Sequence, residues 1–459
     1  MKHWRSLLFS FAALALFLTA FTASGATAAK PNILVIYIDD LGFADLASTG
    51  NDKVPTPNMD SLARNGVRFT DSYVTACVCS PSRAALMTGR YQQRFGFDAN
   101  AEGAVRKGDR SPHALDIQQT TFAQRFQQLG YATGLVGKWH LGASEGYLPG
   151  QRGFQEFYGL LPHGVGAGKG EEPVPIYRGT NKVAIPADHT VAFGGEAVSF
   201  IERHHAEPWF LYLAFTAVHA PHSAPADYLK RFANLDKAHQ AYYAMIACAD
   251  DSVGQVLAKL REHKLEENTL IFFASDNGGP TSAAVSNGPY RGGKWSLWEG
   301  GIRSPVFVQW KGHIKPGRDI KAMVTQLDWL PTALAATGAE VKPDWQLDGV
   351  NLLPLLEGKT TAPPHDALFW RFGVQYAVRQ GDWKLVKPSL SSAPKLFNLG
   401  QDNGETTDLA AKEPEKVKQL QALWDAWNAK NEAPRWNDER WNGLEEKAEN
   451  KKEKKGKKK

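Results

Sequence analysis

Cysteine is scarce in this sequence, which has three cysteines, Cys77, Cys79 and Cys248, among 459 residues. So few cysteines exclude a disulfide-based scaffold, and stability must come from a large hydrophobic core, which a chain of this length can bury. A bridge from Cys248 to one of the other two stays open at this point. However, Cys248 lies in an amphipathic helical pattern, where a small buried side chain is the better interpretation.

Long hydrophobic runs are also scarce, and the main one lies at the N-terminus, from Leu7 to Ala23. Lys2 and Arg5 precede it and an A-x-A pattern at 26–28 follows, so residues 1–28 are predicted to be a cleaved signal peptide rather than a retained anchor. No cysteine follows the run, which argues against a lipid anchor, and no later run reaches membrane-spanning length without charges. We therefore expect a soluble periplasmic or secreted protein without a stable membrane anchor.

An excess of charge is absent from the body of the chain, although the formal net charge is +5. The last fifteen residues, 445–459, contain eight lysines and four glutamates, and Lys2 and Arg5 add two further positive charges. The remainder is close to neutral, so a basic nucleic-acid-binding body is excluded, and no nucleic-acid partner is expected. The lysine-rich tail is predicted to be disordered and solvated, with contact to a polyanion as the alternative.

Apolar runs with the composition of buried strands begin at 32, 132, 209, 268 and 304, and helical patterns such as 120–130 and 248–263 separate them. This alternation predicts an α/β fold with a large, mostly parallel or mixed sheet sandwiched by helices. Asp, Asn, His and Lys recur where these runs end. Because the carboxyl ends of parallel strands open on one side of a sheet, we expect these polar residues to converge.

The composition changes near residue 364, after a stretch rich in turns and prolines. Shorter, aromatic-rich strand patterns follow over 367–386, and then a helical pattern over 413–430. We predict a main domain over 29–363, a smaller C-terminal α+β domain over 364–444, and the tail over 445–459.

The stretch "CVCSPSRAALMTGR", residues 77–90, places two cysteines just before a predicted helix. Ser80 suits an N-cap and Pro81 the first helical position, so the helix is predicted to begin at Pro81. Cys79 would then lie at a helix N-terminus, where free N–H groups favour an anion and Arg83 can reach back. A reactive thiolate is one interpretation, whereas a metal clip is weaker because no second cysteine pair completes it.

The segment "CSPSRAALMTGR" resembles the signature of the type I, formylglycine-dependent sulfatases, of the arylsulfatase family in the alkaline phosphatase superfamily. That signature is C-x-P-S-R followed by T-G-R, and counting from Cys79, not from Cys77, puts Pro81 and Arg83 in place. The resemblance implies an alkaline-phosphatase-like fold. It also implies that a formylglycine-generating enzyme oxidises Cys79 to formylglycine, an aldehyde that hydrates to a gem-diol.

Other motifs extend the resemblance over most of the mature chain. It implies one divalent cation, Ca²⁺ with Mg²⁺ possible, bound by the oxygen ligands Asp39, Asp40, Asp276 and Asn277 together with residue 79. It implies that Lys138, His219 and Lys294 hold the sulfate and leaving oxygen, and that Arg83 and His140 flank the gem-diol. His222 and His163 are weaker substrate-side candidates, since each suits an ordinary loop equally well.

The resemblance implies hydrolysis of a sulfate monoester, with a nucleophilic gem-diol hydroxyl and protonation of the leaving oxygen by His219, alone or together with Lys294. His140 would deprotonate the second hydroxyl and so release sulfate. The expected substrate is a sulfated polysaccharide or oligosaccharide, with Trp139, Trp295 and Trp298 as possible sugar-stacking side chains or core residues. A phosphonate or phosphodiester hydrolase of the same fold, and a non-catalytic sulfated-glycan binder with an unmodified Cys79, remain alternatives.

Overall fold

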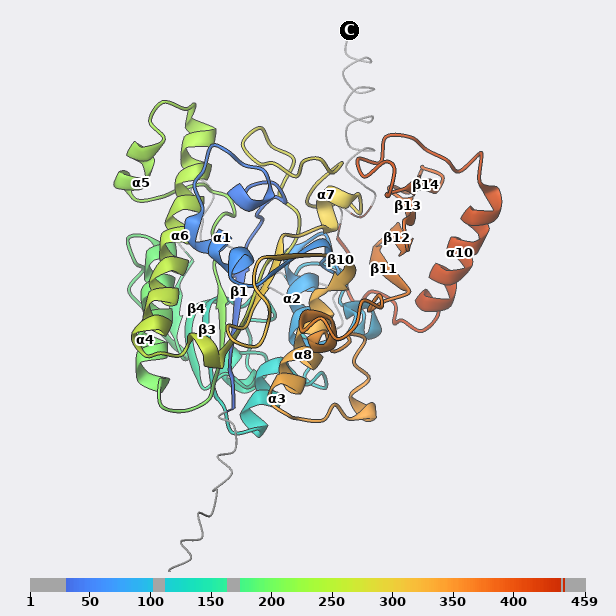
Figure 1. The fold of residues 1–459 in the computed structure, drawn as a ribbon. Helices are drawn as coiled ribbons and strands as arrows, with labels where there is room; N and C mark the ends of the chain where they lie inside the picture. The colour runs from blue at the N-terminus through green and yellow to red at the C-terminus, as the bar shows by residue number, and fades with distance from the viewer. Residues whose placement is uncertain (1–29, 102–111, 163–173, 439–440, 442–459) are drawn as a thin grey trace, which may run out of the picture.

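The protein is described here by a computed structural model that covers residues 30–101, 112–162, 174–438 and 441 (Figure 1). The predicted signal peptide, the lysine-rich tail and His163 therefore lie outside the described residues. Among the residues covered, no helix is long and apolar enough to cross a membrane.

The larger of two sheets in the described chain has ten strands in the order β10-β2-β9-β8-β1-β7-β3-β4-β5-β6. Its strands are β1 (Asn32–Ile38), β2 (Val67–Tyr73), β3 (Ala132–Lys138), β4 (Glu156–Leu160), β5 (Ile176–Arg178), β6 (Asn181–Val183), β7 (Trp209–Ala214), β8 (Thr269–Ser275), β9 (Val306–Gln309) and β10 (Arg318–Thr325). The central block β8-β1-β7-β3-β4 is parallel, whereas β9 runs antiparallel to both β8 and β2. The predicted mixed α/β fold is confirmed.

Both faces of this sheet are covered by helices (Figure 1). One face packs against α1 (Pro57–Arg64), α4 (His189–His204) and α6 (Lys237–Glu262). The other packs against α2 (Cys79–Thr88), α3 (Phe122–Gln128) and α8 (Trp329–Ala336). Alternate residues of β1 enter the two hydrophobic clusters, so every residue of this strand is buried, which explains its continuous apolar sequence.

A second, antiparallel sheet follows in the chain, with the order β11-β12-β13-β14. It consists of β11 (Ala367–Phe372), β12 (Gln375–Gln380), β13 (Trp383–Lys387) and β14 (Lys395–Asn398), and α10 (Pro414–Asn428) packs against it. The remaining short helices are α5 (Ala226–Arg231), α7 (Glu299–Ile302) and α9 (Leu353–Leu356). The predicted smaller α+β region is present, and its exact boundary at residue 364 stays a prediction.

Candidate active site

Cys79 is the first residue of α2, so this helix begins two residues before the predicted start at Pro81. That prediction is wrong because Ser80 does not cap the helix. Its hydroxyl donates to the carbonyl of His140 at 2.5 Å and accepts from the amide of Ala101 at 3.1 Å. Pro81 becomes the third helical residue, where its missing N–H leaves no helical bond unmade.

The carboxyl ends of β1 and β8 bring four predicted metal ligands together. Ile38 and Ser275 are paired in these parallel strands, so the Asp39-Asp40 and Asp276-Asn277 pairs follow at the same edge of the sheet. The amide of Asp40 donates to Oδ1 of Asp276 at 3.2 Å. Ligand atoms of Asp39, Asp40, Cys79 and Asp276 all lie within 4.8 Å of one another, and all four residues are buried. The predicted convergence is thus observed.

Each of the three carboxylates has a cationic partner from a different segment of the chain. The pairs are Lys138–Asp39 at 2.5 Å, Lys294–Asp40 at 2.7 Å and Arg83–Asp276 at 2.7 Å. Three buried negative charges are therefore matched by three buried positive charges. This matching offsets the large free-energy cost of removing isolated ions from water.

Arg83 is fixed by contacts that extend beyond its carboxylate partner. Its Nη1 donates to the carbonyl of Lys138 at 3.2 Å and to the hydroxyl of Tyr212 at 3.3 Å. Its guanidinium also lies 5.5 Å from the ring centroid of Tyr37. Sequence reasoning missed Tyr212, whose only signal was one hydroxyl in the apolar run of β7.

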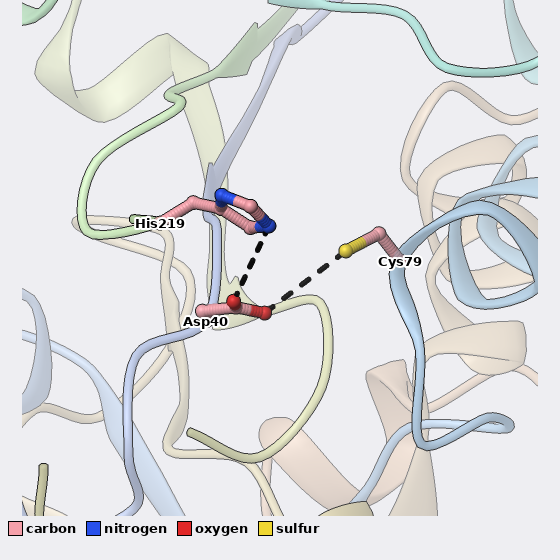
Figure 2. A group of neighbouring side chains, drawn as sticks. All are labelled: Asp40, Cys79 and His219. Atoms are coloured by element: carbon pink, nitrogen blue, oxygen red, sulfur yellow. Dashed lines mark hydrogen bonds and ion pairs between the residues drawn. The ribbon is translucent and has the colours of Figure 1, made fainter. Parts of the chain in front are cut away.

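His219 approaches the carboxylate cluster from the loop after β7 (Figure 2). Its Nε2 lies 3.6 Å from Oδ2 of Asp40, and its Nδ1 lies 2.6 Å from the carbonyl oxygen of Ala220. A carbonyl oxygen only accepts, so Nδ1 carries a proton and Nε2 is the nitrogen that faces the site. Sγ of Cys79 lies 4.0 Å from Oδ1 of Asp40.

The other candidates differ in their surroundings. His140 is buried and has a positive φ of 57°, a sparsely populated conformation that Asp40 shares at 63°. His222 is half-buried, and the centroid of its ring lies 5.1 Å from that of Tyr242. Trp139 and Trp298 are core residues, whereas Trp295 is only partly buried and packs against the cluster that contains Trp298.

Burial and neighbouring charges shift the ionisation of the site. Burial, followed by the charge of Asp39, raises the pKa of the Cys79 thiol well above its usual range. Although burial would raise the pKa of Asp40, Lys294 and His219 lower it to about 2. Burial and Asp39 raise the pKa of Asp276 to about 6. The protein groups therefore favour a neutral thiol, contrary to a reactive-thiolate interpretation.

The donor atoms fit a hard divalent cation. Nδ2 of Asn277 donates to Oδ1 of Asp40 at 2.7 Å and to the carbonyl of Gly278 at 3.0 Å. Its Oδ1 is buried and has no hydrogen-bond partner among the described residues. One orphaned amide oxygen beside three carboxylates is the oxygen-rich ligand set that Ca²⁺ and Mg²⁺ prefer, whereas Zn²⁺ favours nitrogen and sulfur.

Comparison with known proteins places this geometry in a family. Residues 31–339 match the sulfatase family model, and residues 293–430 match the model of the C-terminal region of N-sulphoglucosamine sulphohydrolase. Arylsulfatase A of Bos taurus is 33% identical over 88% of this chain and 89% of its own length. N-acetylgalactosamine-6-sulfatase of Homo sapiens is 33% identical over 84% of this chain and 83% of its own length.

Solved structures agree with these relatives. The crystal structure of Ps i-CgsB has a TM-score of 0.82 and 32% identity, covering 91% of this chain and 96% of that one. The same protein in complex with k-i-k-neocarrahexaose also has a TM-score of 0.82, with 31% identity and the same coverage. The chain therefore belongs to the sulfatase family and is a hydrolase of sulfate esters.

Proposed function

We propose that this protein hydrolyses sulfate monoesters on a sulfated polysaccharide or oligosaccharide, with a formylglycine made from Cys79 as the nucleophile. The observation that carries the proposal is the position of Cys79 at the start of α2, within 4.8 Å of three buried aspartates. Three positively charged side chains, those of Arg83, Lys138 and Lys294, form ion pairs with those aspartates. Once formed, a hydrated formylglycine supplies one hydroxyl for attack on sulfur and a second for release of sulfate.

Lys138, Lys294 and Arg83 counter the negative charge that repels a nucleophile from a sulfate ester. Each lysine ammonium has three donors, of which one is directed to an aspartate. The remaining donors can bind sulfate oxygens. Arg83 is held too firmly by Asp276 and Tyr212 to follow a substrate, so its role is to fix positive charge beside residue 79.

His219 is the proposed acid that protonates the leaving oxygen. Its Nδ1 proton is engaged by the carbonyl of Ala220, which leaves Nε2 to deliver a proton into the site. Burial lowers the pKa of His219 to about 4, against the opposing effect of Asp40, so the free site favours the neutral ring. An anionic ester close to Nε2 would favour the charged ring, so His219 would take up a proton from solvent as the substrate binds. His140 is the proposed base for the second hydroxyl.

The divalent cation would be held by Asp39, Asp40, Asp276 and Asn277, with Ca²⁺ proposed and Mg²⁺ as the alternative. It would supply positive charge opposite the sulfate oxygens. Its identity is tested by removing metal with a chelator and adding each cation back. We expect activity to be lost on chelation and restored more fully by Ca²⁺.

A sulfated glycan is the proposed substrate because the similar protein Ps i-CgsB was crystallised with k-i-k-neocarrahexaose. Within this chain, Trp295 supports a sugar site: it is partly buried, follows Lys294 directly, and has a positive φ of 75°. His222 and His163 remain proposed substrate-side residues. Export to the periplasm or medium, and maturation by a formylglycine-generating enzyme, complete the proposal.

The test is sulfate release from k-i-k-neocarrahexaose and related oligosaccharides by protein co-expressed with a formylglycine-generating enzyme. Cys79→Ala should lower turnover at least about 10³-fold, as expected for loss of a nucleophile. Cys77→Ala is the matched control, because Cys77 is buried in a hydrophobic cluster and should be dispensable for turnover.

The alternatives give different results in the same experiment. Faster hydrolysis of phosphonate monoesters or phosphodiesters than of any sulfate ester would favour the phosphorus hydrolase. Tight glycan binding without sulfate release, from protein whose Cys79 stays unmodified after co-expression, would favour a binding protein. Near-wild-type turnover by Cys79→Ala would contradict the proposed nucleophile.

A further inference from the structure

A second group of positive charge, the half-buried Arg90 and the buried Arg125, lies at the other end of α2 from Cys79. The helix has ten residues and so separates its two ends by about 15 Å. Arg90 follows its C-terminus and faces α3 and the 3₁₀ turn Pro343–Trp345 across a cavity of about 350 Å³. We call this cavity the Arg90–Arg125 pocket, and it is lined by Arg90, Gln118, Gln119, Thr120, Arg125, Gln128, Asp344 and Trp345.

Arg125 is the most unusual residue of this pocket. It is 7% exposed, and its guanidinium stacks on the ring of Trp345 at 3.8 Å from the centroid. Its side chain makes no hydrogen bond or ion pair with any residue that the structure describes, and its Nε is fully shielded. Burial lowers the pKa of Arg125 to about 10, because the attraction of Asp344 offsets only part of the loss of hydration.

Arg90 adds a second poorly compensated charge. Its Nη1 donates to Oε1 of Gln119 at 2.9 Å and its Nη2 to Oε1 of Gln346 at 3.2 Å, both neutral acceptors. Its Nε is shielded and has no partner in the described structure. Burial also lowers the pKa of Arg90, in spite of the attraction of Asp348.

The nearby acidic residues do not neutralise the charges of Arg90 and Arg125. Asp348 is engaged by Arg94, with Oδ1 2.8 Å from Nη2, and by the amide of Tyr91 at 2.9 Å. Asp344 lines the pocket but is exposed to solvent and forms no ion pair with a described residue. The buried guanidinium of Arg125 and the half-buried guanidinium of Arg90 therefore face a cavity whose one lining acid, Asp344, is exposed to solvent.

We propose that the Arg90–Arg125 pocket binds a tetrahedral oxyanion, either free sulfate or a sulfate group carried by a sugar. Guanidinium donors form charge-assisted hydrogen bonds with sulfate oxygens, and the planar fork can engage two of them at once. The volume suits a small organic ligand, and the amide side chains of Gln118, Gln119 and Gln128 can bond sugar hydroxyls. The pocket is separate from the Cys79 site and does not depend on hydrolysis.

Arg125→Gln is the test variant, because Arg90 belongs to the signature segment and its replacement could disturb maturation. Arg231→Gln is the matched control: Arg231 also stacks on an aromatic ring, that of Tyr228 at 4.2 Å, and its replacement removes the same charge. Crystals of each protein soaked in selenate would reveal bound anions by anomalous scattering. Titration with a sulfated oligosaccharide would then separate the two ligand sources.

For wild type and Arg231→Gln we expect a selenate peak between the two guanidinium groups, in addition to any at the Cys79 site. Arg125→Gln should lose this peak and bind the second equivalent of anion at least about tenfold more weakly than wild type. Its turnover of a small aryl sulfate should be unchanged. Arg125→Lys should restore part of the binding. A second equivalent of oligosaccharide that depends on Arg125, without a selenate peak, would assign the pocket to a sugar-borne sulfate. If folded wild-type protein showed neither the selenate peak nor a second, Arg125-dependent equivalent of oligosaccharide, the proposal would be overturned.

Discussion

Replacing Lys384 with methionine should destabilise the protein strongly, because this ammonium is the centre of a buried ionic group. Lys384 lies on β13 and is fully buried. Its Nζ lies 2.8 Å from carboxylate oxygens of both Glu299 and Glu405 and 2.8 Å from the carbonyl oxygen of Leu297. Methionine has a similar length but no charge, so the variant leaves two buried carboxylates facing each other.

Removing one member of a buried ion group costs about 3–5 kcal/mol, since the partners stay buried without compensation. Lys395→Met on the adjacent strand β14 is the control, because Lys395 is 36% exposed and lies 3.6 Å from Asp408. An exposed pair of this kind contributes about 1 kcal/mol at most. Urea unfolding, monitored by tryptophan fluorescence, measures the free energy of unfolding of the two variants. Equal losses of stability in the two variants would refute this account of Lys384.

Three further predictions concern the surroundings of the site. Burial raises the pKa of Glu405 to about 7, above its ordinary value of 4.5, so its ionisation destabilises the fold as the pH rises from about 4.5 to 7. Glu405→Gln should therefore make the free energy of unfolding less dependent on pH over that window. The same pH dependence in the variant and in wild type would exclude Glu405 as the cause. Ser80→Ala removes the hydroxyl that donates to the carbonyl of His140, so it should lower the free energy of unfolding by about 1–3 kcal/mol and also lower kcat. An unchanged melting temperature and an unchanged kcat would show that this hydrogen bond is unimportant. A Cβ on Gly278 would lie 1.8 Å from the carbonyl oxygen of Gly300. Gly278→Ala should therefore displace the adjacent ligand segment and lower kcat about 10²-fold. Gly150→Ala, whose Cβ would lie in open space, should keep full activity.

The parallel strands were predictable because they are buried on both faces. A strand such as β1 must be apolar throughout, and its polar successors Asp39 and Asp40 mark where it ends. The sequence "RDIKAMVT" of β10 carried no such signal, since this strand lies at the sheet edge and is partly exposed. The antiparallel direction of β9 was equally hidden, because strand direction depends on connections and not on composition.

The site residues were identified by their motifs, but their pairing was not. Lys294 pairs with Asp40 across 254 positions of sequence, and Lys138 pairs with Asp39 across 99. Local patterns cannot encode such contacts. The start of α2 was misplaced for the same reason: the hydroxyl of Ser80, a good cap in isolation, has tertiary partners in the folded chain.

The chemical state of residue 79 tests the central claim most directly. The peptide containing Cys79 should be measured by mass spectrometry, from active protein co-expressed with a formylglycine-generating enzyme, alongside the same peptide from Ser82→Ala as a control for signature recognition. The account predicts the mass of an aldehyde or its hydrate in place of the thiol, in a proportion that rises with specific activity. An intact thiol in a preparation that releases sulfate at full rate would contradict it.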